Sequence, residues 1–290
     1  LKDIDQMMEW SLGVVEIAKN YTVENLEELA PFGSFDSNHL SLTGADGSYE
    51  IYDGGLRAQT ADGEKIFDHV DNDKYAEYLG EEVKSWSYMK FPFIRSIGPA
   101  EGWHRVGALA RVNNADSFST PEAEAARKEF AAVTNGKPCN VTMGYHWARM
   151  IELLHSTEKI KELLNDPDLQ GTDLVTKGER RNEGIGIIEA PRGTLFHHYQ
   201  VDDQDQVTIA NLIVSTTSNN VPMNLAVQKV AEDHLSGQAE ISEGMLNRVE
   251  VAIRAYDPCL SCATHAMGQM PLTVELYDHE GTMIDTRSKG

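Results

Sequence analysis

Residues 254–265 read RAYDPCLSCATH, and they place two cysteines and a histidine directly after a stretch with helical periodicity. Cys259 and Cys262 are three positions apart, so one turn of chain brings both sulfurs within reach of a single metal ion. The Asp-Pro pair before them removes a backbone donor and favours a turn, which a rigid ligand loop requires. The remaining cysteine is Cys139. Metal binding is therefore the first hypothesis that the sequence raises.

The rest of the chain alternates between helical and strand-like periodicity. Helical spacing of apolar residues predicts helices over residues 3–20, 120–133, 141–164, 222–234 and 241–256. Alternating patterns bounded by turn residues predict strands within residues 38–68, 184–190, 195–201, 207–214 and 272–285. We therefore predict a helix-dominated α+β fold with a helical bundle core. Residues 38–68 should form a small antiparallel meander as an appendage, and residues 272–285 a C-terminal hairpin.

Composition excludes several classes of partner. The 290 residues carry a net charge of -21, which would repel nucleic acid and an anionic membrane surface. No apolar run approaches the roughly 20 residues of a membrane span, and no signal peptide opens the chain. Three cysteines are too few for a disulfide scaffold and suit reduced thiols in the cytoplasm. The sequence begins inside a predicted helix, so we expect it to be part of a longer protein.

Spacing alone leaves several interpretations of the two thiols open. Covalent haem attachment is excluded, because two residues separate Cys262 from His265. A thioredoxin-like redox pair is disfavoured, because such pairs follow a strand and this one follows a predicted helix. A structural zinc site, a catalytic centre of soft metals and a pair of unligated core cysteines remain. The zinc site would need a fourth ligand from among Cys139, His146, His155, His197 and His198.

Four segments carry a resemblance to one enzyme family. The motif DPCLSCATH at residues 257–265 resembles the C-terminal metal motif of the large subunit of nickel–iron hydrogenases. Similar family segments are EAPRG at 189–193 (followed by His197), VSTTSN at 214–219 and VGALARVN at 106–113. The segments at 86–93 and 145–149 look most like the soluble, NAD-reducing bidirectional members.

The resemblance implies a set of metal ligands. In that family, nickel is held by four cysteine thiolates, two of which bridge to an iron that carries carbon monoxide and cyanide. By match of motif, Cys259 would be a terminal nickel ligand with a catalytic role, and Cys262 a bridging ligand. His265 would lie at a nearby site for a divalent ion, magnesium or iron. The implied reaction is the heterolytic cleavage of dihydrogen, with a thiolate on nickel as a plausible base.

The resemblance also implies residues around the metals. Arg192 would lie over them as a catalytic and cofactor-binding residue, with its guanidinium donating toward a cyanide nitrogen. Pro191 would close the pocket from the apolar side. Thr216 would donate its hydroxyl to the second cyanide, with Ser215 as the next candidate. The ordinary alternatives are a surface salt bridge for Arg192 and a plain strand hydroxyl for Thr216.

The sequence departs from the family at one point that matters. The family's other nickel-binding cysteine pair is absent, and Cys139 has no second cysteine three residues away. We therefore expect residues 1–290 to be the C-terminal portion of the large subunit, inactive alone and without nickel or iron, although zinc could bind the motif. Residues 266–290 should be a cleavable extension, removed by a maturation protease after nickel chaperones have acted.

The resemblance implies further partners: a flavin module that reduces NAD, together with an iron–sulfur small subunit, all in the cytoplasm. Neither a cluster nor a dinucleotide could bind within this chain, which lacks the cysteines and the glycine-rich fingerprint. Two alternatives from other classes remain at this stage. One is a non-catalytic, hydrogenase-like assembly scaffold, and the other is a structural zinc-binding domain.

Overall fold

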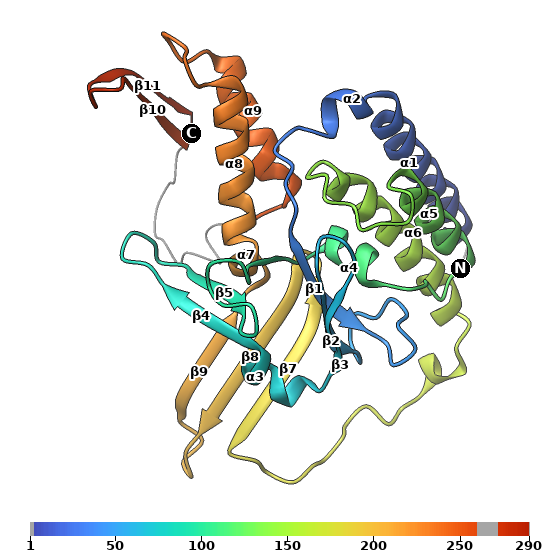
Figure 1. Ribbon diagram of the computed structural model, residues 1–290. Coiled ribbons are helices and arrows are strands. Elements are labelled where there is room, and N and C mark those ends of the chain that lie inside the picture. The colour runs from blue at the N-terminus through green and yellow to red at the C-terminus, as the bar shows by residue number, and fades with distance from the viewer. Residues whose placement is uncertain (1–2, 260–271, 290) are drawn as a thin grey trace.

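The computed structural model describes residues 3–259 and 272–289, and it combines helices with small sheets (Figure 1). The helices are α1 Ile4–Glu24, α2 Leu26–Leu29, α3 Tyr75–Tyr78, α4 Ala108–Asn114, α5 Pro121–Val133, α6 Gly144–Leu163, α7 Ser215–Ser218, α8 Asn220–His234 and α9 Glu243–Ala255. The strands are β1 Asn38–Thr43, β2 Gly55–Gln59, β3 Lys65–Val70, β4 Leu79–Val83, β5 Lys90–Ile94, β6 His104–Arg105, β7 Glu183–Ala190, β8 Gly193–Val201, β9 Val207–Ile213, β10 Leu272–Tyr277 and β11 Met283–Lys289.

A helical core forms one half of the molecule. Helices α1, α5 and α6 pack together, and α8 pairs with α9 (Figure 1). The contacts are made by apolar residues at helical spacing, such as Ala123, Ala126 and Phe130 of α5. Small buried residues of α8 and α9, including Ala226 and Ala252, let these two helices approach closely. One continuous apolar cluster therefore joins both groups of helices.

A second core lies between sheets. The first sheet has the order β3-β2-β1-β6, with β1 antiparallel to β2 and parallel to β6. The second sheet has the antiparallel order β7-β8-β9. Leu40 and Leu42 of β1 and Leu56 of β2 pack in one apolar cluster with Ile187 and Phe196 of the second sheet. The helices therefore do not account for the fold by themselves.

Of the strands in the meander expected as an appendage, only β3 is exposed, whereas β1 and β2 are buried. All residues of β2 and all but the first of β1 are buried. The face of these strands that does not contact the second sheet is polar, and its side chains form hydrogen bonds with α4. The Asn114 amide donates to Ser41 at 2.9 Å, and Arg57 donates to the Asn114 carbonyl at 2.6 Å. These side-chain contacts to a helix bury the polar face of two strands that were expected in an appendage.

Other expectations are confirmed. The α+β class holds, and the predicted helices and strands appear within a few residues of their expected bounds. The C-terminal hairpin exists as antiparallel β10 and β11. It contacts the N-terminal end of α9 and the residues before it, since Ile241 N–H donates to Asp285 at 2.8 Å and Lys289 donates to Asn247 at 2.6 Å. No helix in residues 3–259 or 272–289 is both long and apolar enough to cross a membrane.

Candidate active site

The chain leaves α9 in a turn that brings Cys259 against α7. Arg149 of α6 donates to the carbonyl of Ala255 at 3.0 Å, which satisfies a free acceptor at the helix end. Asp257 then adopts a left-handed backbone with φ of 50°, a conformation that aspartate tolerates better than most residues. Two residues later, the N–H of Cys259 donates to Thr216 Oγ1 at 3.2 Å. The sequence-predicted residues Cys259 and Thr216 are therefore neighbours.

Arg192 reaches the same place from the turn between β7 and β8. Its Nε donates to the Asp257 carbonyl at 2.5 Å and lies 3.4 Å from the Asp257 carboxylate. The guanidinium thus sits beside the residue that lies two positions before Cys259. Its side chain remains 40% exposed, so it is not sealed in the core. A cation from the β7–β8 turn therefore contacts the segment that leads to Cys259.

Two glycines allow this turn to approach the rest of the fold. A Cβ on Gly193, whose φ is 135°, would lie 2.3 Å from Val106 Cγ2. A Cβ on Gly107, whose φ is 94°, would lie 2.8 Å from the Arg192 carbonyl oxygen. Both positions demand the absence of a side chain. The Arg192 backbone is therefore packed directly against the segment before α4.

The two predicted hydroxyl residues are buried at the first turn after β9. Ser215 Oγ donates to the Gly193 carbonyl at 2.7 Å, which ties α7 to the β7–β8 turn. Thr216 accepts from Cys259, so its own hydroxyl hydrogen is left to donate elsewhere. Pro191 is exposed and lines a pocket of about 540 Å³ together with Asp257, Glu152 and Arg111. Thr216 therefore contacts Cys259, while Ser215 contacts the β7–β8 turn.

The other candidate ligands lie elsewhere. Cys139 is buried among apolar residues of the helical core, and burial raises the pKa of its thiol. Cys139 is therefore a thiol of the apolar core. The four histidines considered for zinc have other contacts: His146 with Arg149, His155 with Thr120, His197 with Tyr199, and His198 with Tyr75 and Glu183.

The donor chemistry around Cys259 fits a thiolate-bound metal in part. The backbone N–H of Cys259, a residue with a soft sulfur donor, contacts the buried hydroxyl of Thr216, and Arg192 contacts Asp257 two residues earlier. Cys262 and His265 lie outside the described residues. Within the described parts of the chain, no group of three histidine, cysteine or carboxylate side chains could hold a metal. Cys259 and residues after it would therefore have to act together with ligands from elsewhere.

Sequence reasoning missed the residue that joins the two halves of the site. Asp257 was interpreted only as part of a turn, whereas its carbonyl and carboxylate both contact Arg192. An acidic residue directly before Pro258 and Cys259 was a signal that an arginine elsewhere could be its partner. The buried contacts of Arg111 under the turn were also missed, although Arg111 belongs to the recognised segment 106–113.

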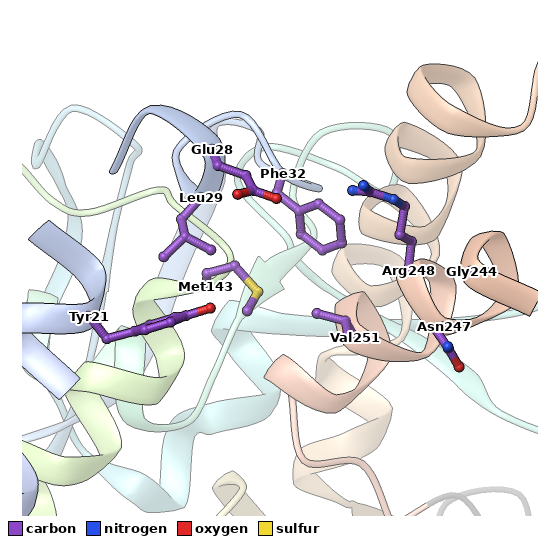
Figure 2. A pocket seen from close by; sticks show the side chains of 9 residues that line it. All are labelled: Tyr21, Glu28, Leu29, Phe32, Met143, Gly244, Asn247, Arg248 and Val251. Carbon is purple, nitrogen blue, oxygen red and sulfur yellow. The ribbon is translucent and has the colours of Figure 1, made fainter. Parts of the chain in front are cut away.

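A separate hollow lies away from these residues. A groove of about 390 Å³ is lined by residues of α1, α2 and α9 and by Phe32 and Met143. Figure 2 shows Met143 between Tyr21 and Val251. Glu28 stands on one wall and Arg248 on the other. No residue predicted for the active site lines it.

Comparison with known proteins gives consistent matches. A sequence model of the nickel-dependent hydrogenase family matches residues 19–265. The NAD-reducing hydrogenase HoxS subunit beta of Cupriavidus necator is 44% identical over 292 residues, covering 100% of this chain and 60% of that protein. An F420-non-reducing hydrogenase iron-sulfur subunit of Archaeoglobus profundus is 40% identical, covering 98% of this chain and 60% of that protein.

Solved structures agree. A crystal structure of an NAD+-reducing NiFe hydrogenase in the H2-reduced state matches with a TM-score of 0.87 and 47% identity, over 91% of this chain and 58% of that one. A NiFeSe hydrogenase of Dm. baculatum matches with a TM-score of 0.65 and 20% identity, which shows the fold alone; it covers 90% of this chain and 58% of that one. The chain thus spans about 60% of the length of the relatives it matches. On these matches, the chain belongs to the nickel-dependent hydrogenase family.

Proposed function

We propose that this chain forms part of the large subunit of a nickel–iron hydrogenase that couples the reversible oxidation of dihydrogen to NAD. The main supporting observation is that Cys259 contacts Thr216 and that Asp257, two residues before Cys259, contacts Arg192. A 44% identical relative and a structural match at TM-score 0.87 are both named as NAD-reducing hydrogenases, which supports this electron acceptor.

Cys259 and Cys262 would supply two thiolates to a nickel–iron centre that carries carbon monoxide and cyanide on iron. The other two nickel thiolates would come from a part of the large subunit outside this chain, which has three cysteines in all. Without them the chain alone would be inactive and would hold neither nickel nor iron. His265 would contribute to a nearby divalent-ion site. The chemistry that such a centre supplies when bound is the heterolytic cleavage of dihydrogen.

This chain's own residues would shape the space around that centre. Arg192, held by Asp257, would place a positive charge near the segment that carries Cys259. Ser215 and Thr216 present buried hydroxyls from α7, and Pro191 limits access from the β7–β8 turn. A thiolate next to a guanidinium is a group that can hold and release a proton.

Residues 266–290 would be an extension removed during maturation. The family match ends at residue 265, which supports this boundary. The hairpin beyond it is half exposed, as expected of a segment that can leave. The partners would be a flavin module that reduces NAD, an iron–sulfur small subunit, nickel chaperones and a maturation protease, all in the cytoplasm.

The test is hydrogen-dependent reduction of NAD by the complete enzyme with its partner subunits. Replacing Arg192 by lysine keeps a charge but loses the planar donor set, so kcat should fall by about 10–100-fold. The matched control is Arg180→Lys, because Arg180 is an exposed arginine paired with Asp205 far from the site. The control should keep wild-type activity. Equal activity in all three proteins, or no hydrogen-dependent reduction in any, would overturn the proposal.

A further inference from the structure

A buried arginine lies directly beneath the turn that carries Arg192. Arg111 of α4 is 3% exposed and makes ion pairs with two carboxylates from different elements. Its Nε and one terminal nitrogen donate to Glu152 of α6 at 2.5 and 2.8 Å. Its other terminal nitrogen donates to Glu189 of β7 at 2.8 Å. The guanidinium is thus held in one plane by two anions.

The same guanidinium also holds the backbone of the turn. It donates to the Ala190 carbonyl at 2.8 Å and to the Pro191 carbonyl at 3.0 Å. These are the two residues immediately before Arg192. A planar fork with several fixed donors can serve two carboxylates and two carbonyls at once, which an ammonium group cannot do.

Each carboxylate is itself fixed by further bonds. Tyr49 donates its hydroxyl to Glu152 at 3.1 Å. Glu189 accepts from the N–H of Leu42 at 2.9 Å and from the Thr194 hydroxyl at 2.7 Å. The position of Arg111 is therefore set from the first sheet, the second sheet and α6 together.

The cluster keeps its arginine charged. Burial disfavours the charged form, but Glu152 and Glu189 outweigh it and raise the pKa of Arg111 well above its usual value. Burial also raises the pKa of Glu189, although Arg111 and Thr194 favour its ionised form. Breaking such a cluster leaves uncompensated buried groups, so its geometry is held firmly.

We propose that Arg111 is a positioning residue for Arg192. It fixes the Ala190 and Pro191 carbonyls, and it thereby directs the Arg192 guanidinium toward Asp257 beside Cys259. This inference rests on the proposed function, because it gives Arg192 a role at the metals. Glu152 supports this role by holding the plane of the Arg111 guanidinium through two hydrogen bonds.

The alternative is an ion cluster that only stabilises the fold, and the chain offers a matched control for it. Arg57 of β2 is also 3% exposed, pairs with Asp68 and Asp116, and donates to a backbone carbonyl, that of Asn114. Its carbonyl contact is in α4 and not in the β7–β8 turn. Arg57→Lys should therefore reduce stability without displacing Arg192.

The experiment compares Arg111→Lys, Glu152→Gln and Arg57→Lys in the complete, metal-loaded enzyme. Arg111→Lys and Glu152→Gln should lower kcat by about 10-fold with little change in KM, at unchanged nickel and iron content. They should also shift the infrared stretching bands of the cyanide ligands, because Arg192 moves. Arg57→Lys should leave both kcat and the bands unchanged. If Arg111→Lys and Arg57→Lys change kcat and the infrared bands to the same extent, the positioning role is wrong.

A double variant separates this inference from the proposed function. If Arg111 acts through Arg192, Arg111→Lys should change kcat less than about twofold in an Arg192→Ala background. A full, independent 10-fold loss in that background would overturn the positioning role alone. If Arg192→Ala by itself leaves kcat and the infrared bands unchanged, the proposed role of Arg192 at the metals fails first. Glu152→Gln keeps the shape of the side chain, so it remains informative if Arg111→Lys does not fold.

Discussion

At the scale of single residues, Gly193 and Gly107 decide how closely the β7–β8 turn can approach the segment before α4. A Cβ on Gly193 would meet both Val106 and the Gly107 nitrogen at under 3 Å, and Gly193 has a φ of 135°. A methyl group there must push the two segments apart. Because Arg192 is the next residue back along the chain, its position depends on this contact.

Gly193→Ala should lower the free energy of unfolding by about 2 kcal/mol more than Gly98→Ala. Gly98 is the control, because its φ is 93° but a Cβ there would meet nothing within 4 Å. Urea denaturation measures both changes. Equal losses would mean that only the backbone angle matters at Gly193 and that the close approach does not exist.

Asp257 provides a second residue-level prediction. Its backbone is left-handed, with φ of 50°. This conformation is unfavourable for an alanine, whose Cβ crowds the backbone and whose side chain cannot form a compensating hydrogen bond. Asp257→Ala should therefore be less stable than Asp257→Gly by about 1 kcal/mol, although both lose the ion pair with Arg192. Denaturation curves at pH 7 decide this. If alanine is as stable as glycine, the turn that delivers Cys259 has a different backbone.

Residue types at the site could be predicted from the sequence, but their partners could not. Arg192, Thr216 and Cys259 were identified because they lie in short motifs. The contacts that Thr216, Asp257 and Arg111 make with the site join positions 43, 65 and 80 residues apart, respectively, and no local pattern encodes such pairs.

At the scale of elements, the parallel pair of β1 and β6 buries one histidine from each strand, with His39 opposite Arg105 and His104 opposite Asn38. Burial, with the nearby charge of Arg105, lowers the pKa of His39 to about 3. Burial lowers the pKa of His104 to about 4, against its contact with the Gly102 carbonyl. Both are neutral in the folded state, whereas in the unfolded chain they protonate near pH 6.5.

Above about pH 6.5 both states are unprotonated, and the histidines do not reduce stability. As the pH falls from 6.5 toward 4, only the unfolded chain binds protons at these histidines, so the free energy of unfolding decreases. Between pH 7 and 5 the two histidines should reduce the free energy of unfolding by on the order of 3 kcal/mol. Burial raises the pKa of Glu189, so that carboxyl acts in the opposite direction. The change produced by one histidine is thus the cleaner measurement.

His104→Gln should remove about half of this acid-induced loss in urea titrations at pH 7 and 5. His279→Gln is the control, because His279 is exposed in the hairpin. An unchanged pH slope in His104→Gln would show that this histidine is not buried in its neutral form.

Local periodicity was sufficient to predict most elements, because the buried face of a helix or strand requires apolar residues at a regular spacing along the sequence. It failed for the environment of β1 and β2. Their polar face is covered through Ser41 and Arg57 bonding to Asn114 of α4, so polarity there did not mean exposure. The hairpin of β4 and β5 was also not predicted, and Gly80 and Pro92 interrupt its alternation.

At the scale of the whole molecule, the candidate site lies where the two cores meet. Arg192 lies in the turn between β7 and β8 of the second sheet, and Asp257 and Cys259 directly follow α9 of the helical core. Helix α7 joins them, since it follows β9 and precedes α8. The site can therefore form only when both cores have folded, which local motifs could not reveal.

The most direct test of this account is the nickel content of the matured enzyme carrying Cys259→Ser, beside Cys139→Ala as the control. Cys139 is buried in the helical core, so its replacement should leave the nickel content at the wild-type level. Cys259→Ser should remove most of the nickel, because a thiolate ligand is lost. Full nickel in Cys259→Ser, or equal losses in both variants, would contradict the placement of the metal centre at Cys259.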